Sequence, residues 1–136
     1  MWTTATTAQA VQAFFAVPSI LMGLSHILQP KLWEQYFVHL RESSPGATAV
    51  ITRTFVLEIW PATLVVVFHS VWSGLALVLT VYGHLLMVKC VVAMLLPERG
   101  MQSLQLADRY GPNGFRIAGV MLVGLGVLCA RLSLGP

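Results

Sequence analysis

Glu58, His84 and Lys89 are ionisable residues inside otherwise apolar segments of this chain. Glu58 lies within ITRTFVLEIWPATLVVVFH, and the other two lie within GLALVLTVYGHLLMVKCVVAMLL. A charged side chain at the centre of a membrane helix costs about 2.5–3.5 kcal/mol on insertion scales, so such residues are generally paired, enclosed between helices or part of a site. These three side chains are therefore the first candidates for chemistry.

Two interpretations of these residues stay open. At the rise of an α-helix, Lys89 lies roughly 10 Å, Glu58 roughly 15 Å and His84 roughly 18 Å from the same end of the helices. Because the two segments are consecutive and antiparallel, Glu58 can face Lys89 in a buried ion pair that fixes helix packing. Alternatively, Glu58 or His84 acts as the base of a proton-handling site, since burial tunes the proton affinity of such groups. His26 is a third catalytic candidate, in a supporting role.

The remaining residue chemistry gives no sign of a metal or cofactor. The four histidines form no HxxxH or HExxH spacing, and the two cysteines form no CxxC pair. His26 is expected near one membrane surface, whereas His69 and Trp72 are expected near the other. Pro61 follows Glu58 by about one turn, and is expected to free a backbone carbonyl and to help shape a small cavity there.

The composition indicates a membrane protein. Of 136 residues, 57% are hydrophobic and only 10% are charged, compared with about 25% charged in soluble domains. The mean hydropathy is +0.77. The length suits a single domain with four helices of about 20 residues each. The basic residues are not clustered, which argues against a nucleic-acid partner, and the main expected partner is the lipid bilayer.

Four apolar segments are predicted to span the membrane, at about residues 7–28, 47–68, 73–96 and 115–132. The second and third are separated by a short turn, and the other connections are longer. Each long connection begins and ends at a proline and contains a short amphipathic helix, the first of which is expected to lie in the headgroup plane. The sequence therefore predicts an all-α integral membrane four-helix bundle built of two tandem helix–amphipathic helix–helix units.

The two units also suggest an internal duplication, covering about residues 7–69 and 74–136. Pro30 and Pro45 are 15 residues apart, as are Pro97 and Pro112. At the corresponding offset of 67 residues, Leu28 aligns with Leu95, Gln35 with Gln102 and Val56 with Val123.

Aromatic and basic residues predict how the helices sit in the bilayer. Trp33, Tyr36, Phe37 and Trp72 are expected to anchor the chain at the two membrane–water interfaces, where amphipathic rings accumulate. The long connections and adjoining helix ends hold most of the basic residues, which are Lys31, Arg41, Arg53, Arg99, Arg109 and Arg116. By the positive-inside rule, the long connections should be cytoplasmic and both termini should lie on the opposite side.

Small residues line the fourth segment at Gly119, Gly126 and Ala130. Such residues let helices approach closely in lipid. The contact that they make is either with another helix of the same chain or with a second subunit, in a homo-oligomer or a larger complex.

The stretches FHSVWSGLALVLTVYGHLLMVK and MGLSHILQPKLW resemble those of small uncharacterised bacterial four-helix membrane proteins. The Pro-bounded helix followed by an apolar helix is also similar to small two-helix bacterial membrane proteins of unknown function. The resemblance implies the fold and a location in the bacterial inner membrane, and it implies no activity.

Three functions remain open, and whether the protein is an enzyme is left undecided. Small size, short loops, glycine-lined helices and the lack of a catalytic motif favour a structural or accessory subunit of a larger membrane complex. The alternatives are a small transporter or proton-coupled carrier that uses Glu58, His84 and Lys89, and an integral-membrane enzyme that acts on a lipid-soluble substrate. An enzyme should have a cavity around Glu58 large enough for an apolar ligand, and a carrier should lose transport on Glu58→Gln.

Overall fold

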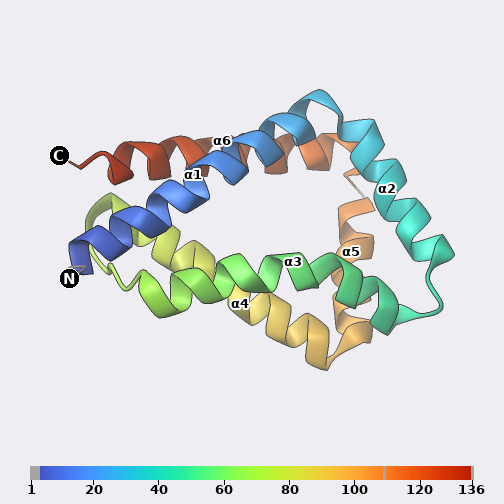
Figure 1. The fold of residues 1–136 in the computed structure, drawn as a ribbon. Coiled ribbons are helices and arrows are strands. Elements are labelled where there is room, and N and C mark those ends of the chain that lie inside the picture. The colour runs from blue at the N-terminus through green and yellow to red at the C-terminus, as the bar shows by residue number, and fades with distance from the viewer. Residues whose placement is uncertain (1–3, 109, 136) are drawn as a thin grey trace.

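The chain folds into six helices joined by short connections, as Figure 1 shows for the residues that the computed structural model describes, 4–108 and 110–135. In order they are α1 (Thr4–Leu28), α2 (Pro30–Ser43), α3 (Ala47–Phe68), α4 (Leu77–Leu95), α5 (Pro97–Asp108) and α6 (Gly111–Ser133), with a 3-10 turn at Gly74–Ala76 before α4. These residues form no strand. The predicted all-α architecture, with four long and two short helices, is confirmed. The long–short–long order occurs twice, while the duplication itself stays a prediction.

Four helices are long and apolar enough to cross a membrane, with candidate spans at Thr6–Leu28, Ala47–Phe68, Gly74–Leu95 and Gly111–Ser133. Their outward faces carry large hydrophobic side chains such as Leu57, Trp60 and Met121, which are 75%, 71% and 71% exposed. Surfaces of this kind require lipid as their solvent. The chain is therefore a multi-pass membrane protein. Which side of the membrane each end faces stays a prediction, and Arg109, on which it partly rests, lies outside the described residues.

The last long helix begins earlier than the sequence predicted, at Gly111 rather than near residue 115. Gly111 has a positive φ of 51°, a conformation that glycine adopts without strain. Pro112 then occupies the first turn, where its missing N–H is not needed. The proline that was expected to close the connection instead starts the helix.

The long helices form two antiparallel pairs, α1 with α6 and α3 with α4 (Figure 1). The pairs converge at the end that holds the short turn at residues 69–73, here called the turn end. They diverge at the other end, where α2 and α5 cross the gap between them, here called the α2–α5 end.

The α1–α6 pair packs through glycine. A Cβ atom at Gly119 would lie 2.6 Å from the backbone oxygen of Gly23, and a Cβ at Gly126 would lie 2.6 Å from Cγ1 of Ile20. Ala130, partly buried, packs against the neighbouring core. Gly119 and Gly126 therefore make their close contacts within the chain, so the glycine pattern gives no support to a second subunit.

Two separate hydrophobic clusters hold the helices together. The cluster at the turn end joins both pairs and consists of Val11, Phe15, Ala16, Val65, Leu79, Leu125 and Cys129. The second cluster lies between α3 and α4 and consists of Ile51, Phe55, Cys90 and Ala93, with Met101 and Leu104 of α5 packed against it. Because the second cluster involves only α3, α4 and α5, it leaves the space between the two pairs unfilled at the α2–α5 end.

Candidate functional site

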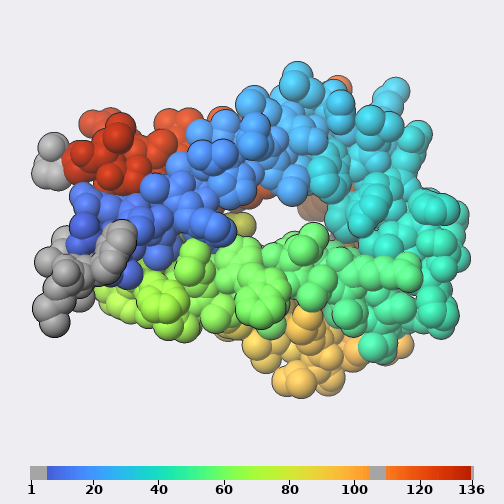
Figure 2. Space-filling model, viewed as in Figure 1, coloured from blue at the N-terminus to red at the C-terminus, as the bar shows by residue number. Residues whose placement is uncertain are grey.

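A cavity of about 290 Å³ lies between the two helix pairs at the α2–α5 end. Figure 2 shows the molecule hollowed between α1–α2, in blue and cyan, and α3, in green. The lining comes from all six helices and the residue before α6, and consists of His26, Phe37, Arg41, Thr54, Glu58, Lys89, Leu104, Tyr110, Gly114, Phe115 and Ala118. Its volume is close to the lower limit for small-molecule sites, about 300 Å³. A largely apolar wall with a few converging polar groups is typical of such sites.

A second hollow, of about 490 Å³, lies at the start of α3. It is larger but shallow, and residues 45–53 supply its whole lining, with Arg53 as the one charged side chain among them. We therefore take the cavity between the helix pairs as the candidate site, because helices distant in sequence converge on it.

An ion pair lies on one wall of the cavity. The Lys89 ammonium donates a hydrogen bond to Oε2 of Glu58 at 2.9 Å, and its nitrogen lies 4.9 Å from the ring centroid of Phe55. The structure thus brings together the two residues that the sequence placed at similar depth. The pair is not enclosed by protein as expected, because 49% of the Lys89 side chain and 34% of the Glu58 side chain are exposed. Exposed charges inside a span need polar surroundings, and the cavity is the space that can supply them.

Thr54 lies one helical turn before Glu58 and lines the same cavity. Its hydroxyl donates to the backbone oxygen of Val50 at 2.8 Å. Because the hydroxyl proton is used in this bond, the Thr54 oxygen can serve a ligand in the cavity only as a hydrogen-bond acceptor.

His26 lines the cavity from α1, in the other helix pair, and its ring is held in place. Nδ1 donates to the backbone oxygen of Met22 at 2.8 Å. When the ring is neutral, Nε2 is therefore left as an acceptor or base. The ring stacks on Trp33 at 4.4 Å and 16°, and the Trp33 indole in turn donates to Oγ of Ser25 at 3.0 Å. His26 is thus a polar group whose orientation is set before any ligand arrives.

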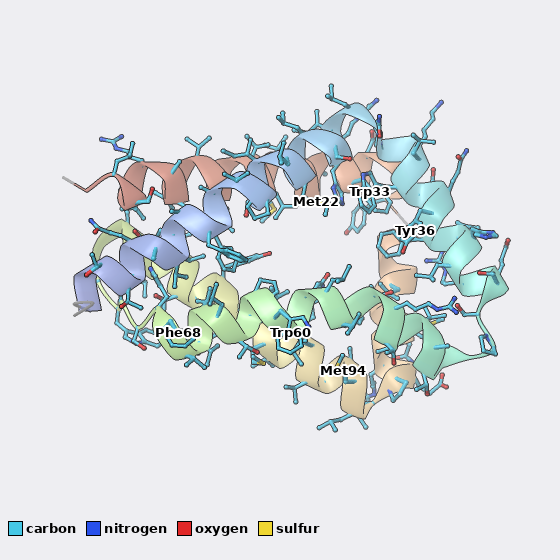
Figure 3. All side chains as sticks on the ribbon, in the orientation of Figure 1. Met22, Trp33, Tyr36, Trp60, Phe68 and Met94 are labelled. Atoms are coloured by element: carbon cyan, nitrogen blue, oxygen red, sulfur yellow. The ribbon has the colours of Figure 1, made fainter. Side chains whose placement is uncertain are left out.

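Aromatic rings form the apolar part of the wall. Phe37 of α2 stacks on Phe115 of α6 at 5.8 Å and 19°, and Phe115 also contacts His26 at 5.7 Å. Trp33 and Tyr36 of α2, labelled in Figure 3, contact Phe37 with ring centroids 6.4 Å and 5.3 Å from its own. Among the predicted interfacial anchors, Trp33 and Phe37 therefore pack inward, whereas Tyr36 and Trp72 are 51% and 60% exposed.

His84 does not belong to the site. Its Nδ1 donates to the backbone oxygen of Thr80 at 2.8 Å, and its ring lies 5.1 Å from Trp72. It does not line the cavity, and neither does Pro61. The cavity expected beside Glu58 is present, and it lies where the two helix pairs diverge; the contribution of Pro61 to its shape stays a prediction.

A buried polar network at the turn end was missed by sequence analysis. The Gln12 amide donates to Nε2 of His69 at 3.0 Å, Nδ1–H of His69 donates to the Thr80 hydroxyl at 3.0 Å, and that hydroxyl donates to the oxygen of Val71 at 2.7 Å. His69 directly follows the candidate span Ala47–Phe68, and its side chain is fully buried within the protein. Burial lowers the pKa of His69 below its ordinary value. The overlooked signal was Gln12, a polar side chain within an apolar helix.

Arg41 and Tyr110 were also missed as site residues. Each lies in or beside one of the two long, proline-bounded connections that the sequence assigned to the membrane surface, and they reach the cavity because α2 and α5 cross its end. Within the described part of the chain, no three His, Cys, Asp or Glu side chains gather in a way that would hold a metal ion.

Comparison of the chain with protein-family models, curated proteins and solved structures found no match. Its function must therefore be inferred from the geometry of the cavity.

Proposed function

We propose that this membrane protein binds an amphipathic small molecule drawn from the bilayer. The polar group of that molecule sits in the cavity against the Glu58–Lys89 pair, and its apolar part extends between the diverging helix pairs into lipid. The observation that carries the proposal is an ion pair exposed to a ligand-sized cavity inside the spanning region. Binding of this kind is the first step that a carrier and an enzyme for lipid-soluble substrates share.

The size and lining of the cavity support this proposal. At about 290 Å³ the cavity accommodates a polar group and the first part of a chain rather than a whole lipid. The polar side chains lie on both walls, with Glu58 and Lys89 on one helix pair and His26 on the other. The rings of Phe37 and Phe115 offer an apolar surface to the rest of the molecule.

Native mass spectrometry of protein extracted gently from its own membrane tests the proposal. Ala118 lines the cavity, so Ala118→Trp fills it with an indole ring. Ala13 is also exposed but does not line the cavity, which makes Ala13→Trp a matched control. The native protein and Ala13→Trp should carry a bound small molecule that Ala118→Trp lacks.

Equal occupancy in all three proteins, or none in the native protein, would overturn the proposal. A heteromeric mass of fixed composition without a small molecule would favour the accessory subunit instead. If a ligand is bound, loss of transport on Glu58→Gln with retained folding would identify a carrier, and loss of turnover would identify an enzyme.

A further inference from the structure

The hydrogen-bonding groups of the cavity point to the class of ligand, an inference that rests on the proposed function. We infer that the polar group of the bound amphiphile is an uncharged hydroxyl, which donates its hydrogen bond to Nε2 of His26. The proposed function is thereby narrowed from amphiphiles of any kind to long-chain alcohols and to lipids that keep a free hydroxyl, such as monoacylglycerols.

The orientation of the His26 ring leaves Nε2 for a ligand. A backbone oxygen only accepts hydrogen bonds, so the bond of 2.8 Å to Met22 requires a proton on Nδ1. Nε2 of the neutral ring is then an acceptor. Because Nδ1 faces the backbone of α1, the ring edge that carries Nε2 points away from that helix. Among the described residues no donor reaches this nitrogen, although His26 lines the cavity.

Neighbouring rings hold His26 in this orientation. Trp33 stacks on the imidazole at 4.4 Å, and Phe115 contacts it at 5.7 Å. Trp33 is itself fixed, because its indole donates to Oγ of Ser25. A side chain that is ordered beforehand loses little conformational freedom when a ligand binds. The hydroxyl of a ligand therefore meets an acceptor that is already in position.

The opposite wall of the cavity adds further acceptors. Lys89 donates to Oε2 of Glu58, which leaves Oε1 as an acceptor. The Thr54 hydroxyl uses its own proton within α3, so its oxygen also accepts. Both side chains line the cavity. A carboxylate has no proton to donate to these groups or to His26, whereas a hydroxyl donates one and accepts in return.

The ion pair disfavours a charged ligand. Glu58 and Lys89 already balance each other at 2.9 Å. An anion would compete with Glu58 for the ammonium, and a cation would compete with Lys89 for the carboxylate. Each would also be repelled by the like charge, and such forces are strong where the dielectric constant is low. Arg41, which also lines the cavity, is engaged in an interaction of its own. A hydroxyl can accept a second N–H of Lys89 and leave the pair intact.

The test compares probes that share one chain and differ in polar group. The full-length protein is placed in nanodiscs of zwitterionic phosphatidylcholine. The binding of oleyl alcohol, monooleoylglycerol, oleyl methyl ether, oleate and oleylamine is measured by native mass spectrometry. The ether is uncharged like the alcohol but has no O–H. A site built to bind a hydroxyl rejects an analogue that lacks it, so the alcohol should bind about tenfold more tightly than the ether. It should also bind more tightly than the two ionic probes, and the tighter of oleyl alcohol and monooleoylglycerol identifies the source of the hydroxyl.

His26→Phe keeps an aromatic ring against Trp33 and removes the acceptor. This variant should lower the affinity for oleyl alcohol to that for the ether, and it should leave the binding of the ether unchanged. His39 is an exposed histidine of α2 that does not line the cavity, so His39→Phe is the matched control and should change neither affinity. If His26→Phe fails to fold, the comparison of alcohol with ether on the native protein still decides the question.

Two results would overturn the inference and leave the proposed function standing, provided that Ala118→Trp abolishes the binding. They are equal binding of alcohol and ether, and tighter binding of oleate or oleylamine than of the alcohol. An equal loss of alcohol and ether binding in His26→Phe would show that His26 only shapes the cavity, and would likewise overturn the inference. Absence of binding by every probe, or binding that Ala118→Trp does not change, would overturn both.

Discussion

Gln12 of α1 and His69 at the end of α3 are joined by a hydrogen bond of 3.0 Å, although they are 57 residues apart in the sequence. Together with Thr80 of α4, they tie the α1–α6 pair to the α3–α4 pair at the turn end. The cavity lies at the opposite end, where the pairs diverge. The network therefore joins the two helix pairs at the turn end, and the candidate site lies at the α2–α5 end.

Removal of Gln12 should destabilise the protein. Gln12→Ala leaves Nε2 of the buried His69 ring without a donor, and an unsatisfied buried polar group costs about 1–3 kcal/mol. Gln35→Ala changes an exposed residue of α2 and is the control. Thermal unfolding in detergent should show a lower Tm for Gln12→Ala only. Equal Tm values for the two variants would mean that the network contributes no stability.

The stability should fall as the medium becomes acidic because of His69. Burial lowers the pKa of His69 in the folded protein. In the unfolded chain the pKa of this residue returns to its ordinary value of 6.5, so the unfolded chain binds a proton more readily. The free energy of unfolding is therefore highest above pH 6.5 and decreases as the pH drops below that value.

Unfolding curves recorded between about pH 8 and pH 5 check this dependence. His69→Gln should be less stable than the native protein at high pH and should lose part of the pH dependence. A native protein whose pH dependence is identical to that of His69→Gln would contradict the assignment.

Gly119 should not tolerate even one added methyl group. In Gly119→Ala the new Cβ would lie 2.6 Å from the backbone oxygen of Gly23, so the two helices must separate. Overpacking of this kind costs about 1–3 kcal/mol. Gly124 is on the same helix, and a Cβ added there would meet no atom within 4 Å, so Gly124→Ala should be neutral or stabilising by up to about 1 kcal/mol through helix propensity. Equal unfolding free energies of the two variants would contradict close α1–α6 packing.

The two members of the ion pair should have opposite effects on the binding of oleate, an anionic amphiphile used here as a probe of the cavity. Lys89→Met removes a positive charge and leaves the Glu58 carboxylate facing the ligand, so oleate should bind at least tenfold more weakly. Glu58→Gln frees the Lys89 ammonium for the ligand, so binding should be retained or tightened. Titration of each variant with oleate measures both effects. Weaker binding in Glu58→Gln than in Lys89→Met would show that the carboxylate, rather than the ammonium, holds the ligand.

The sequence predicted local features better than the contacts between distant helices. Hydropathy located the four long helices because it depends on each segment alone. The approach of Glu58 to Lys89 was also predictable, since the two helices are consecutive and antiparallel and the residues have similar depths. His84 does not line the cavity, because its ring bonds to its own helix and packs on Trp72; its role as a base stays a prediction.

The cavity itself depends on information that a single sequence does not contain. It exists because α1 pairs with α6 rather than with α3, and because the pairs diverge toward α2 and α5. Arg41 and Tyr110 become site residues only through that arrangement. No spacing or motif in the chain links either of them to Glu58.

Photolabelling tests most directly whether an amphiphile occupies the cavity. A long-chain acid and a long-chain alcohol, each with a diazirine next to the polar group, are added to the protein in nanodiscs, and the labelled residues are mapped by mass spectrometry. We predict labels at residues 54–58 of α3 and 114–118 of α6, reduced by excess oleate and absent in Ala118→Trp. Labels spread over outward-facing residues such as Val120, Met121 and Val127, unchanged by oleate, would contradict occupancy of the cavity.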